Sequence, residues 1–284
     1  MPSIDSLLDT VKTSLLTAID NDSLTLPTLP EVALKIREAA SNPDLTAKEL
    51  AELMGKDAAI SARLIRVANS PLARTLHSIE SLPAAINRLG ITYCCNLAVG
   101  LAMEQMFQAT NESIDMRMRQ AWLHCTEVAA VAGVLARHYT HLAPDQAVLA
   151  GLVHEIGILP VLSYAEEHAV LTSPEQLEML EKLIADCHPL LGARILQAWH
   201  FPEWLRQVPE GHTQVNRQSD EPDYIDIVIV AKLQCLADSS HSMASINWQT
   251  VPAFQQLGLS PDRTGVDTEE FDAEKVSALS ALFY

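Results

Sequence analysis

Hydrophobic residues recur at helical spacing along most of this 284-residue sequence. After Asp57, which can cap a first helical turn, Ile60, Leu64 and Val67 line one face of a helix. Thr46 and Glu49 have the spacing of a capping box, which predicts another helix start. The pattern predicts an all-α protein, with helices over residues 30–40, 46–54, 58–68, 83–89, 92–107, 120–138, 144–153, 174–186, 189–199, 224–238 and 268–283.

The polar stretch over residues 108–116 predicts a boundary between two helical lobes. Beyond it, residues 128–136 are apolar on almost every helix face, which is typical of a helix buried on all sides. We expect an N-terminal helical lobe over residues 1–110, a second helical lobe over residues 111–240 and a C-terminal extension over residues 241–284. We expect the extension to pack on the domain; a docking tail is the alternative.

Charge and composition exclude several classes of protein. Nineteen basic and 36 acidic residues give a formal net charge of −17, which disfavours nonspecific nucleic-acid binding and docking on an anionic membrane. The longest apolar stretch, residues 128–136, is far shorter than the roughly 20 residues that span a bilayer, and residues 1–20 lack a signal-peptide pattern. Five cysteines without a CxxC pair indicate reduced thiols, so we expect a cytoplasmic protein.

Four histidines at the edges of apolar segments are the candidate chemistry: His124, His154, His188 and His212. His124 shares a helix face with apolar residues four, seven and eleven positions later, so its ring should point inward. A transition-metal ion takes imidazole nitrogens and a carboxylate oxygen, such as that of Glu155, at about 2.0–2.2 Å, and it can activate a bound water. Taken singly, each histidine is better explained as a hydrogen-bonded core or helix-end residue.

Several motifs in series resemble one known family. The second half contains WLHC over residues 122–125, GLVHEIG over residues 151–157 and HPLLGARILQAW over residues 188–199. The first half contains LPTLP over residues 26–30, DAAISARLIRVANS over residues 57–70 and SLPAAINRLG over residues 81–90. In this order they are similar to the HDOD family, a signalling branch of the HD superfamily of helical metal-dependent phosphohydrolases. The resemblance spans residues 26–236 and implies a two-lobed helical fold, with an HD-like bundle as the second lobe, and a role in bacterial signalling.

The resemblance also implies a degenerate metal site. His124, His154, Glu155 and His188 match the HD ligand positions, and His212 matches a further family histidine. The HD pair itself departs from the family, because His154 is followed by a glutamate where HD enzymes have an aspartate. The extra methylene moves the carboxylate by about 1.5 Å, whereas preorganised sites tolerate about 0.5 Å.

A second departure is Lys232, which occupies the place of the last aspartate ligand of HD enzymes. A protonated lysine cannot coordinate a metal ion and repels it. Asp226 and Asp238 are each six residues away, about 120° around the helix, so neither can replace the missing ligand. We hypothesise that Lys232 substitutes for the metal charge by pairing with Glu155.

These departures predict a non-catalytic HDOD-type regulator without catalytic residues or a required cofactor. It would bind a signalling protein or a small phosphorylated ligand through the degenerate site. The alternative is a metal-dependent phosphohydrolase acting on a nucleotide or cyclic dinucleotide, with a Zn, Ni, Fe or Mn ion held by the same residues: His124, His154, Glu155 and His188. A degraded site could still bind such an ion through three imidazoles.

Other candidates have simpler explanations. Four arginines are expected to lie on solvated helix faces: Arg63, Arg66, Arg74 and Arg88. The alternative is that they contact a phosphate-bearing ligand or an acidic partner. Cys125 and Cys187 adjoin family histidines, yet buried cysteines usually act as small hydrophobic residues. His138 and His141 are expected to cap carbonyls at a helix end.

Overall fold

The computed structural model describes residues 12–15, 17, 21, 27–70, 78–168, 174–237, 239, 241–261 and 269–283. Within these ranges all regular elements are helices and no strand occurs, so the predicted all-α class is confirmed. Arg74 and Asp238 lie outside the described residues. The buried hydrophobic residues form one continuous core.

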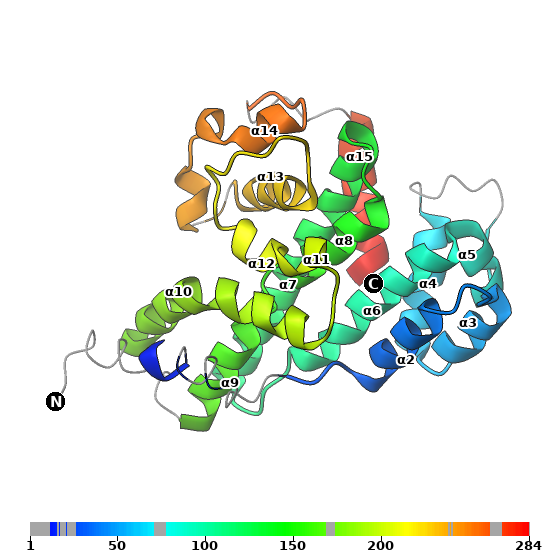
Figure 1. The fold of residues 1–284 in the computed structure, drawn as a ribbon, viewed down its shortest axis with the longest axis horizontal. Coiled ribbons are helices and arrows are strands. Elements are labelled where there is room, and N and C mark those ends of the chain that lie inside the picture. The colour runs from blue at the N-terminus through cyan, green and yellow to red at the C-terminus, as the bar shows by residue number, and fades with distance from the viewer. Residues whose placement is uncertain are drawn as a thin grey trace.

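The helices over residues 31–102 pack together on the right of Figure 1. Thr46 and Glu49 form the predicted capping box, and Asp57 Oδ1 accepts hydrogen bonds from two backbone N–H groups of the first turn that follows it. Gly90 connects the last two helices with φ 94°, a left-handed conformation that glycine adopts without strain. The helices are α2 (Glu31–Ala40), α3 (Ala47–Met54), α4 (Ala58–Asn69), α5 (Leu82–Leu89) and α6 (Ile91–Ala102).

The other helices surround α7, which packs against α8, α9, α13 and α15 (Figure 1). Most of α7 after Thr126 is buried, as its apolar pattern predicts. These elements are η2 (Met103–Met106), α7 (Glu112–Tyr139), α8 (Pro144–Val153), α9 (Ile158–His168), α10 (Pro174–Ala198), α11 (Glu203–Arg206), α12 (Val208–Gly211), α13 (Tyr224–Leu236), η3 (Ser242–Ser245), η4 (Trp248–Thr250), α14 (Pro252–Gln256) and α15 (Glu269–Phe283).

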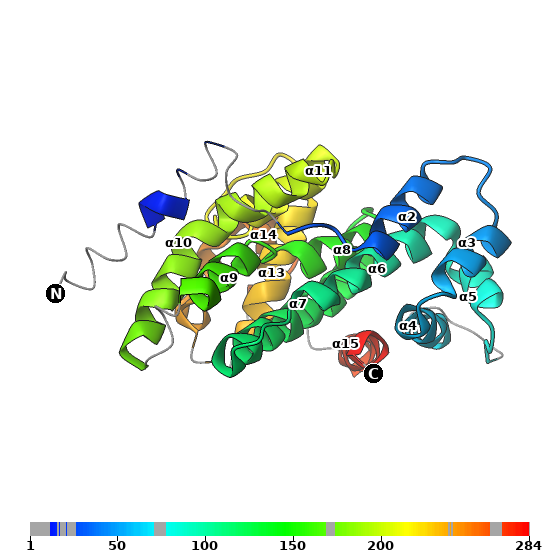
Figure 2. The same cartoon turned by 90° about the horizontal axis from the view of Figure 1, so that it is seen from below.

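The C-terminal helix α15 lies between the two groups of helices. It packs on α7 and on α4, and Figure 2 shows it end-on between them. His138 Nε2, near the end of α7, lies 2.8 Å from Glu274 Oε2 of α15, a contact that the sequence does not predict. This part of the extension therefore joins the core of the protein.

Two glycines allow the close approach of backbones that builds the second group. A Cβ on Gly151 of α8 would lie 2.4 Å from Ala129 Cα of α7, and a Cβ on Gly157 would lie 2.0 Å from the carbonyl oxygen of His188. Distances below 3.0 Å are essentially never seen for a real Cβ, so neither position admits a side chain without movement. The turn after α8 can therefore lie directly against α10.

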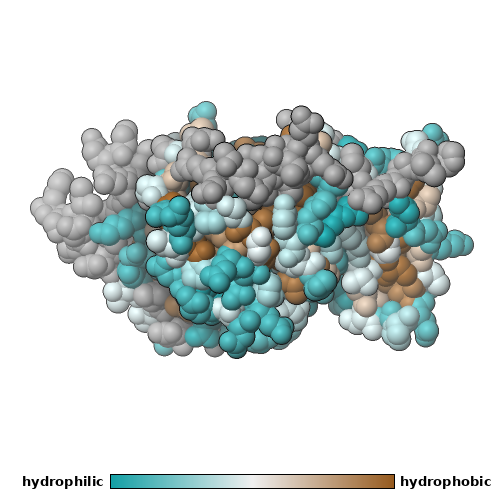
Figure 3. All heavy atoms as spheres, turned by 90° about the horizontal axis from the view of Figure 1, so that it is seen from above, coloured by the Kyte–Doolittle hydropathy of each residue, from teal (hydrophilic) through white to brown (hydrophobic). Residues whose placement is uncertain are grey.

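Hydrophilic residues cover much of the face shown in Figure 3, and hydrophobic residues appear between them. One helical stretch, Pro144–Glu167, comprises α8, α9 and their connecting turn, and its 24 residues are apolar enough to cross a membrane by length and composition alone. However, 83% of its most apolar window is buried inside the protein. Burial of this extent is that of a core segment.

The prediction of separate helices over residues 174–186 and 189–199 is wrong, because α10 continues through Pro189. Proline removes one backbone hydrogen bond and disfavours a helix interior. Tertiary packing offsets this cost, since Leu183, Leu191 and Ile195 are fully buried on both sides of the proline.

Other boundaries also differ from prediction. The helix α7 begins at Glu112, inside the stretch predicted as a lobe boundary, because the Asn111 side chain accepts hydrogen bonds from the N–H groups of Ser113 and Ile114. The sequence pattern does not predict α9. The helix predicted over residues 92–107 ends as an α-helix at Ala102 and continues as the 3₁₀ turn η2.

Candidate functional site

The four predicted histidines come together from four different segments. They are His124 on α7, His154 in the turn after α8, His188 on α10 and His212 after α12. Ring centroids are 5.6 Å apart for His124 and His154, 4.9 Å for His154 and His212, and 5.5 Å for His188 and His212. We call these four residues the histidine cluster.

Backbone carbonyls orient three of the rings. The Nδ1 atoms lie 2.7 Å from Gly151 O for His154, 2.8 Å from Ile184 O for His188 and 3.2 Å from Val208 O for His212. In a neutral imidazole this contact places the proton on Nδ1 and leaves a lone pair on Nε2. All four Nε2 atoms of the histidine cluster are buried and have no hydrogen-bond partner among the described residues.

An internal ion pair lies beside the histidine cluster. Lys232 Nζ, on α13, is 2.6 Å from Glu155 Oε1, and the two side chains are only 4% and 12% exposed. The same carboxylate oxygen lies 3.8 Å from His154 Nε2. The structure thus brings together the six residues that the sequence assigned to the degenerate metal site: His124, His154, Glu155, His188, His212 and Lys232.

Burial controls protonation here. Desolvation lowers the pKa of His154 to about 3, with Lys232 acting in the same direction and Glu155 opposing it. It also lowers the pKa of His212, His124 and His188. For Glu155, burial alone would raise the pKa, but the attraction of the Lys232 ammonium outweighs it and holds the pKa well below its ordinary value. Neutral imidazoles therefore surround a charged pair.

The spacing of possible ligand atoms alone would allow a metal ion at either of two sets of three side chains, which share Glu155. The donor atoms of His124, His154 and Glu155 lie within 4.8 Å of one another, and so do those of Glu155, His188 and His212. Both groups need the carboxylate of Glu155, which the ammonium of Lys232 contacts. With Lys232 in this position, the residues do not fit a divalent ion held through Glu155, because the lysine charge would repel it.

The histidine cluster and the ion pair adjoin an open cleft of about 470 Å³, a size within the range of small-molecule sites. At the cleft, Arg117 of α7 forms an ion pair with Glu181 of α10. His241, just before η3, also lines it. These three residues were not predicted from the sequence, because neither a family motif nor an apolar face marks them.

Asp226, the acidic residue six positions before Lys232, belongs to a different hydrogen-bond network. Asp226 is 1% exposed and accepts hydrogen bonds from Arg217 at 2.6 Å and Ser219 at 2.7 Å, at the start of α13. Its carboxylate also accepts a hydrogen bond from the backbone N–H of Asp223. Asp226 therefore caps α13 and takes no part in the cleft.

The remaining sequence candidates do not form a second catalytic centre among the described residues. Arg63 forms an ion pair with Glu104, with the nitrogen and oxygen 2.5 Å apart, so it stabilises a contact between α4 and η2. Burial raises the thiol pKa of Cys125 and Cys187, so neither is a thiolate at neutral pH.

Comparison with known proteins bears on the family and the fold. The HDOD domain family matches residues 26–215. No curated protein matches the chain. A solved structure from Shewanella amazonensis, described as "Putative metal-dependent phosphohydrolase", has 33% identity and a TM-score of 0.84, with 97% of this chain and 99% of that chain covered.

Two more distant structures share the fold. An HDOD domain protein with unknown function from Geobacter sulfurreducens has 21% identity and a TM-score of 0.61, with 99% of this chain and 98% of that one covered. A protein from Marinobacter aquaeolei, described as "Putative signal transduction protein", has 20% identity and a TM-score of 0.56, with 97% and 65% covered. The family match covers well over half of the sequence, and the chain belongs to the HDOD family.

Proposed function

We propose that this chain is a non-catalytic HDOD regulator that acts by binding, with Lys232 in the place of a catalytic metal ion. The observation that carries the proposal is the 2.6 Å contact between Lys232 and Glu155. The ammonium of Lys232 has three N–H groups, and one of them donates a hydrogen bond to Glu155. The Nε2 lone pairs of the histidine cluster are hydrogen-bond acceptors, and a nearby cation is favourable for them. The ammonium of Lys232 would thus supply the positive charge that a metal-dependent hydrolase obtains by binding a metal ion from solution.

The cleft beside this pair is the binding site in the proposal. Its volume suits a small molecule. Arg117 and Lys232, which are paired at the cleft with Glu181 and Glu155, are the cations that a phosphorylated ligand would contact in place of these carboxylates. A signalling protein is the other ligand class in the proposal. Native mass spectrometry of the purified chain would distinguish them, because a retained small molecule adds a defined mass and a protein partner adds a second subunit.

A metal-dependent phosphohydrolase is the second candidate, and one observation favours it. Histidines that bind metal through Nε2 usually donate Nδ1–H to a backbone carbonyl or carboxylate, and three rings of the histidine cluster contact backbone carbonyls through Nδ1. The S. amazonensis protein is also described as an enzyme of this kind. In this candidate the substrate would be a nucleotide or cyclic dinucleotide, and Lys232 would have to leave Glu155.

Metal binding by three lysine variants separates the two candidates. Zn²⁺ and Mn²⁺ binding would be measured by titration calorimetry and by elemental analysis of the protein. We expect weak, substoichiometric binding by the original chain and at least about tenfold tighter binding by Lys232→Asp, which restores a carboxylate. Lys232→Met removes the charge without adding a ligand, and Lys48→Asp, on the exposed face of α3, controls for net charge.

Hydrolysis completes the test. The original chain, loaded with each metal, would be assayed on bis(p-nitrophenyl) phosphate and on a cyclic dinucleotide. We expect no turnover. Stoichiometric metal in the original chain, together with turnover that His154→Ala abolishes, would contradict the binding role and establish the phosphohydrolase.

A further inference from the structure

A groove outside the histidine cluster lies where α2 and α6 meet α8 and the turn that joins α10 to α11. Its volume is about 410 Å³, within the range of small-molecule sites. The described residues that line it are all different from those that line the cleft of the histidine cluster. We call it the α2 groove.

The walls of the α2 groove are mainly apolar. Val99 of α6, Leu149 of α8 and Phe201 after α10 are 2%, 2% and 7% exposed. Leu34 of α2 also lines the groove and is 43% exposed, so it lies where the groove opens to solvent. A ligand with an apolar group would cover these side chains, and the burial of hydrocarbon against them would favour binding.

Arg37 of α2 supplies a positive charge at the α2 groove. Its guanidinium donates hydrogen bonds to the carbonyl oxygens of Trp199 at 2.6 Å and His200 at 3.1 Å, and its central carbon lies 4.1 Å from the ring centroid of Phe201. The two hydrogen bonds use two of its five N–H groups. Burial lowers the pKa of Arg37, and no carboxylate forms an ion pair with it among the described residues.

Three other half-buried arginines are different, because each forms an ion pair with a carboxylate. Arg63 pairs with Glu104, Arg117 with Glu181, and Arg217 with Asp223. In these cases the neighbouring anion compensates for the partial loss of water around the guanidinium. The guanidinium of Arg37 has only neutral partners, so an anionic group in the α2 groove would form its first ion pair.

Glu38, the next residue of α2, lines the same groove and is exposed. Among the described residues it has neither a hydrogen-bond partner nor an ion-pair partner for its carboxylate. The α2 groove therefore offers one cation and one anion beside apolar walls. A ligand that carries a carboxylate alone would be repelled by Glu38, and one that carries an ammonium alone would be repelled by Arg37.

We propose that the α2 groove binds a free α-amino acid with a large apolar side chain. The carboxylate of the ligand accepts hydrogen bonds from the remaining N–H groups of Arg37, and its ammonium pairs with Glu38. The apolar side chain lies against Val99, Leu149 and Phe201. Two opposite charges on one carbon atom match two opposite charges on adjacent residues of α2, and the planar guanidinium matches a carboxylate.

The position of the α2 groove gives the ligand a structural effect. Arg37 holds the carbonyl of His200, whose φ of 55° makes it the one non-glycine residue with positive φ in the described part of the chain. A ligand bound to Arg37 would therefore contact α2 and also fix the residue that holds this turn before α11. Its binding energy would stabilise the contact between the two groups of helices. This function is independent of the cleft at the histidine cluster.

Three amino acids are suitable probes for the full chain: L-phenylalanine, L-tryptophan and L-leucine. We expect saturable binding of at least one by titration calorimetry, with a ligand-dependent rise in Tm. N-acetyl-L-phenylalanine lacks the ammonium and should bind at least about threefold more weakly than L-phenylalanine. Phenethylamine lacks the carboxylate and should bind at least about tenfold more weakly, because it loses the charge-assisted hydrogen bonds to Arg37.

Matched variants test the location. We expect Glu38→Gln to weaken L-phenylalanine binding at least about threefold and to remove the difference between L-phenylalanine and its N-acetyl derivative. Arg37→Lys should weaken binding at least about tenfold, because lysine keeps the charge but lacks the planar fork. Glu52→Gln, on the exposed face of α3, controls for net charge and should bind within about twofold of the original chain. Circular dichroism would confirm that each variant is folded.

Three results would overturn the proposal. The first is the absence of saturable binding of all three amino acids to the folded original chain. The second is equal binding of L-phenylalanine and N-acetyl-L-phenylalanine by the original chain, which would exclude recognition of the ammonium. The third is binding that neither Glu38→Gln nor Arg37→Lys alters, which would place the ligand elsewhere. Lys232→Met should leave amino-acid binding unchanged, and a loss in that variant would assign the ligand to the cleft of the histidine cluster instead.

Discussion

The two ends of α13 use a buried charge in different ways. Asp226, in the first turn, is surrounded by groups that satisfy it, with Arg217 at 2.6 Å and Ser219 at 2.7 Å. Lys232, further along the helix, has its carboxylate partner Glu155 at 2.6 Å. Yet the histidine rings beside that pair have buried Nε2 atoms without hydrogen-bond partners among the described residues.

The difference distinguishes a charge that caps a helix from the charge at the proposed site. Unpartnered buried polar atoms are rare, because each costs about 1–3 kcal/mol relative to a satisfied one. Four such atoms beside one ion pair are the feature that the proposed ligand site would explain. The Asp226 network carries no such cost, and it accounts fully for its residues as a helix cap.

The largest effect is expected for Glu155→Ala. Removal of the carboxylate leaves the ammonium of Lys232 buried without its ion-pair partner, and breaking a buried pair in this way costs about 3–5 kcal/mol. Urea unfolding would measure the loss in free energy of unfolding. The double variant Glu155→Gln with Lys232→Met should recover most of it, because both charges are then absent. A double variant as unstable as the single one would show that the pair itself is not the cause.

Asp226→Asn should have a smaller effect, about 1–2 kcal/mol. The asparagine keeps the shape of the side chain, and Arg217 retains its contacts with Asp223 at 2.6 and 2.9 Å. The same urea unfolding experiment compares it with Glu155→Ala. Metal binding by the Lys232→Asp background should stay unchanged, and its loss would place Asp226 in the proposed site after all.

The histidine cluster predicts a pH dependence of stability. The pKa values of all four histidines are lower in the folded chain than in the unfolded one, where they are about 6.5. Below that pH the unfolded chain binds more protons, so the free energy of unfolding falls as the pH is lowered. Each histidine contributes up to about 1.4 kcal/mol per pH unit.

Urea unfolding between pH 7.5 and pH 5 measures this slope, and His212→Leu removes one of the four titrating groups. We expect the variant to lose stability less steeply below pH 6.5. Glu155 affects a lower range, because its stabilisation is complete above its unfolded pKa of about 4.5 and is lost as the pH falls below it. An identical slope in His212→Leu would mean that folding does not lower the pKa of His212.

The sequence predicts those features that depend on neighbours along the chain. The capping box of Thr46 and Glu49 and the Asp57 cap are local, and both are present as predicted. The buried face of α7 follows in the same way from its apolar pattern. The set of residues around the histidine cluster came from motif resemblance, which carries information about tertiary structure that spacing does not contain.

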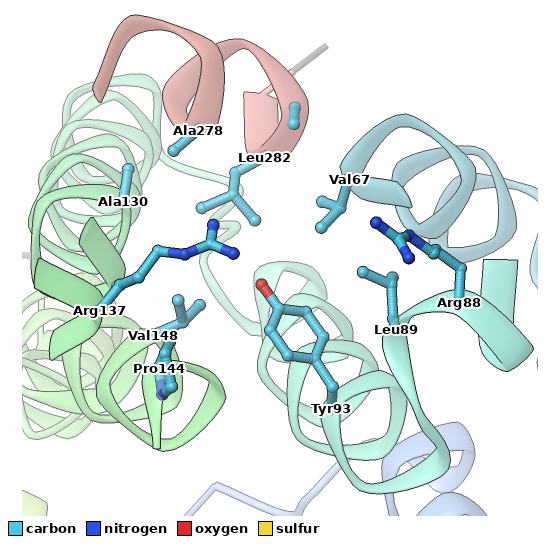
Figure 4. A pocket seen from close by; sticks show the side chains of 12 residues that line it. Val67, Arg88, Leu89, Tyr93, Ala130, Arg137, Pro144, Val148, Ala278 and Leu282 are labelled. Carbon is cyan, nitrogen blue, oxygen red and sulfur yellow. The ribbon is translucent and has the colours of Figure 1, made fainter. Parts of the chain in front are cut away.

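Features that depend on distant packing were not predictable. The helix α10 continues through Pro189 only because Leu183 and Leu191 are buried by other helices. The carbonyl contacts that orient the histidine rings require the folded turns. The cavity between α15, α4 and α6 exists because Leu282 lies near Val67 and Tyr93 (Figure 4), and no local pattern predicts that proximity.

The smallest effects provide the sharpest test of the comparison, because the two ends of α13 should respond in different directions. Ser219→Ala removes one hydrogen bond from Asp226 and should lower the free energy of unfolding by about 1 kcal/mol. His212→Leu at pH 7.5 replaces a buried ring, whose Nε2 has no partner among the described residues, by an apolar side chain. Its stability should stay equal or rise by up to about 1 kcal/mol, while metal binding by a Lys232→Asp background should weaken. If His212→Leu instead destabilised the chain as much as Ser219→Ala, the histidine would be a structural residue, and the contrast between the two ends of α13 would disappear.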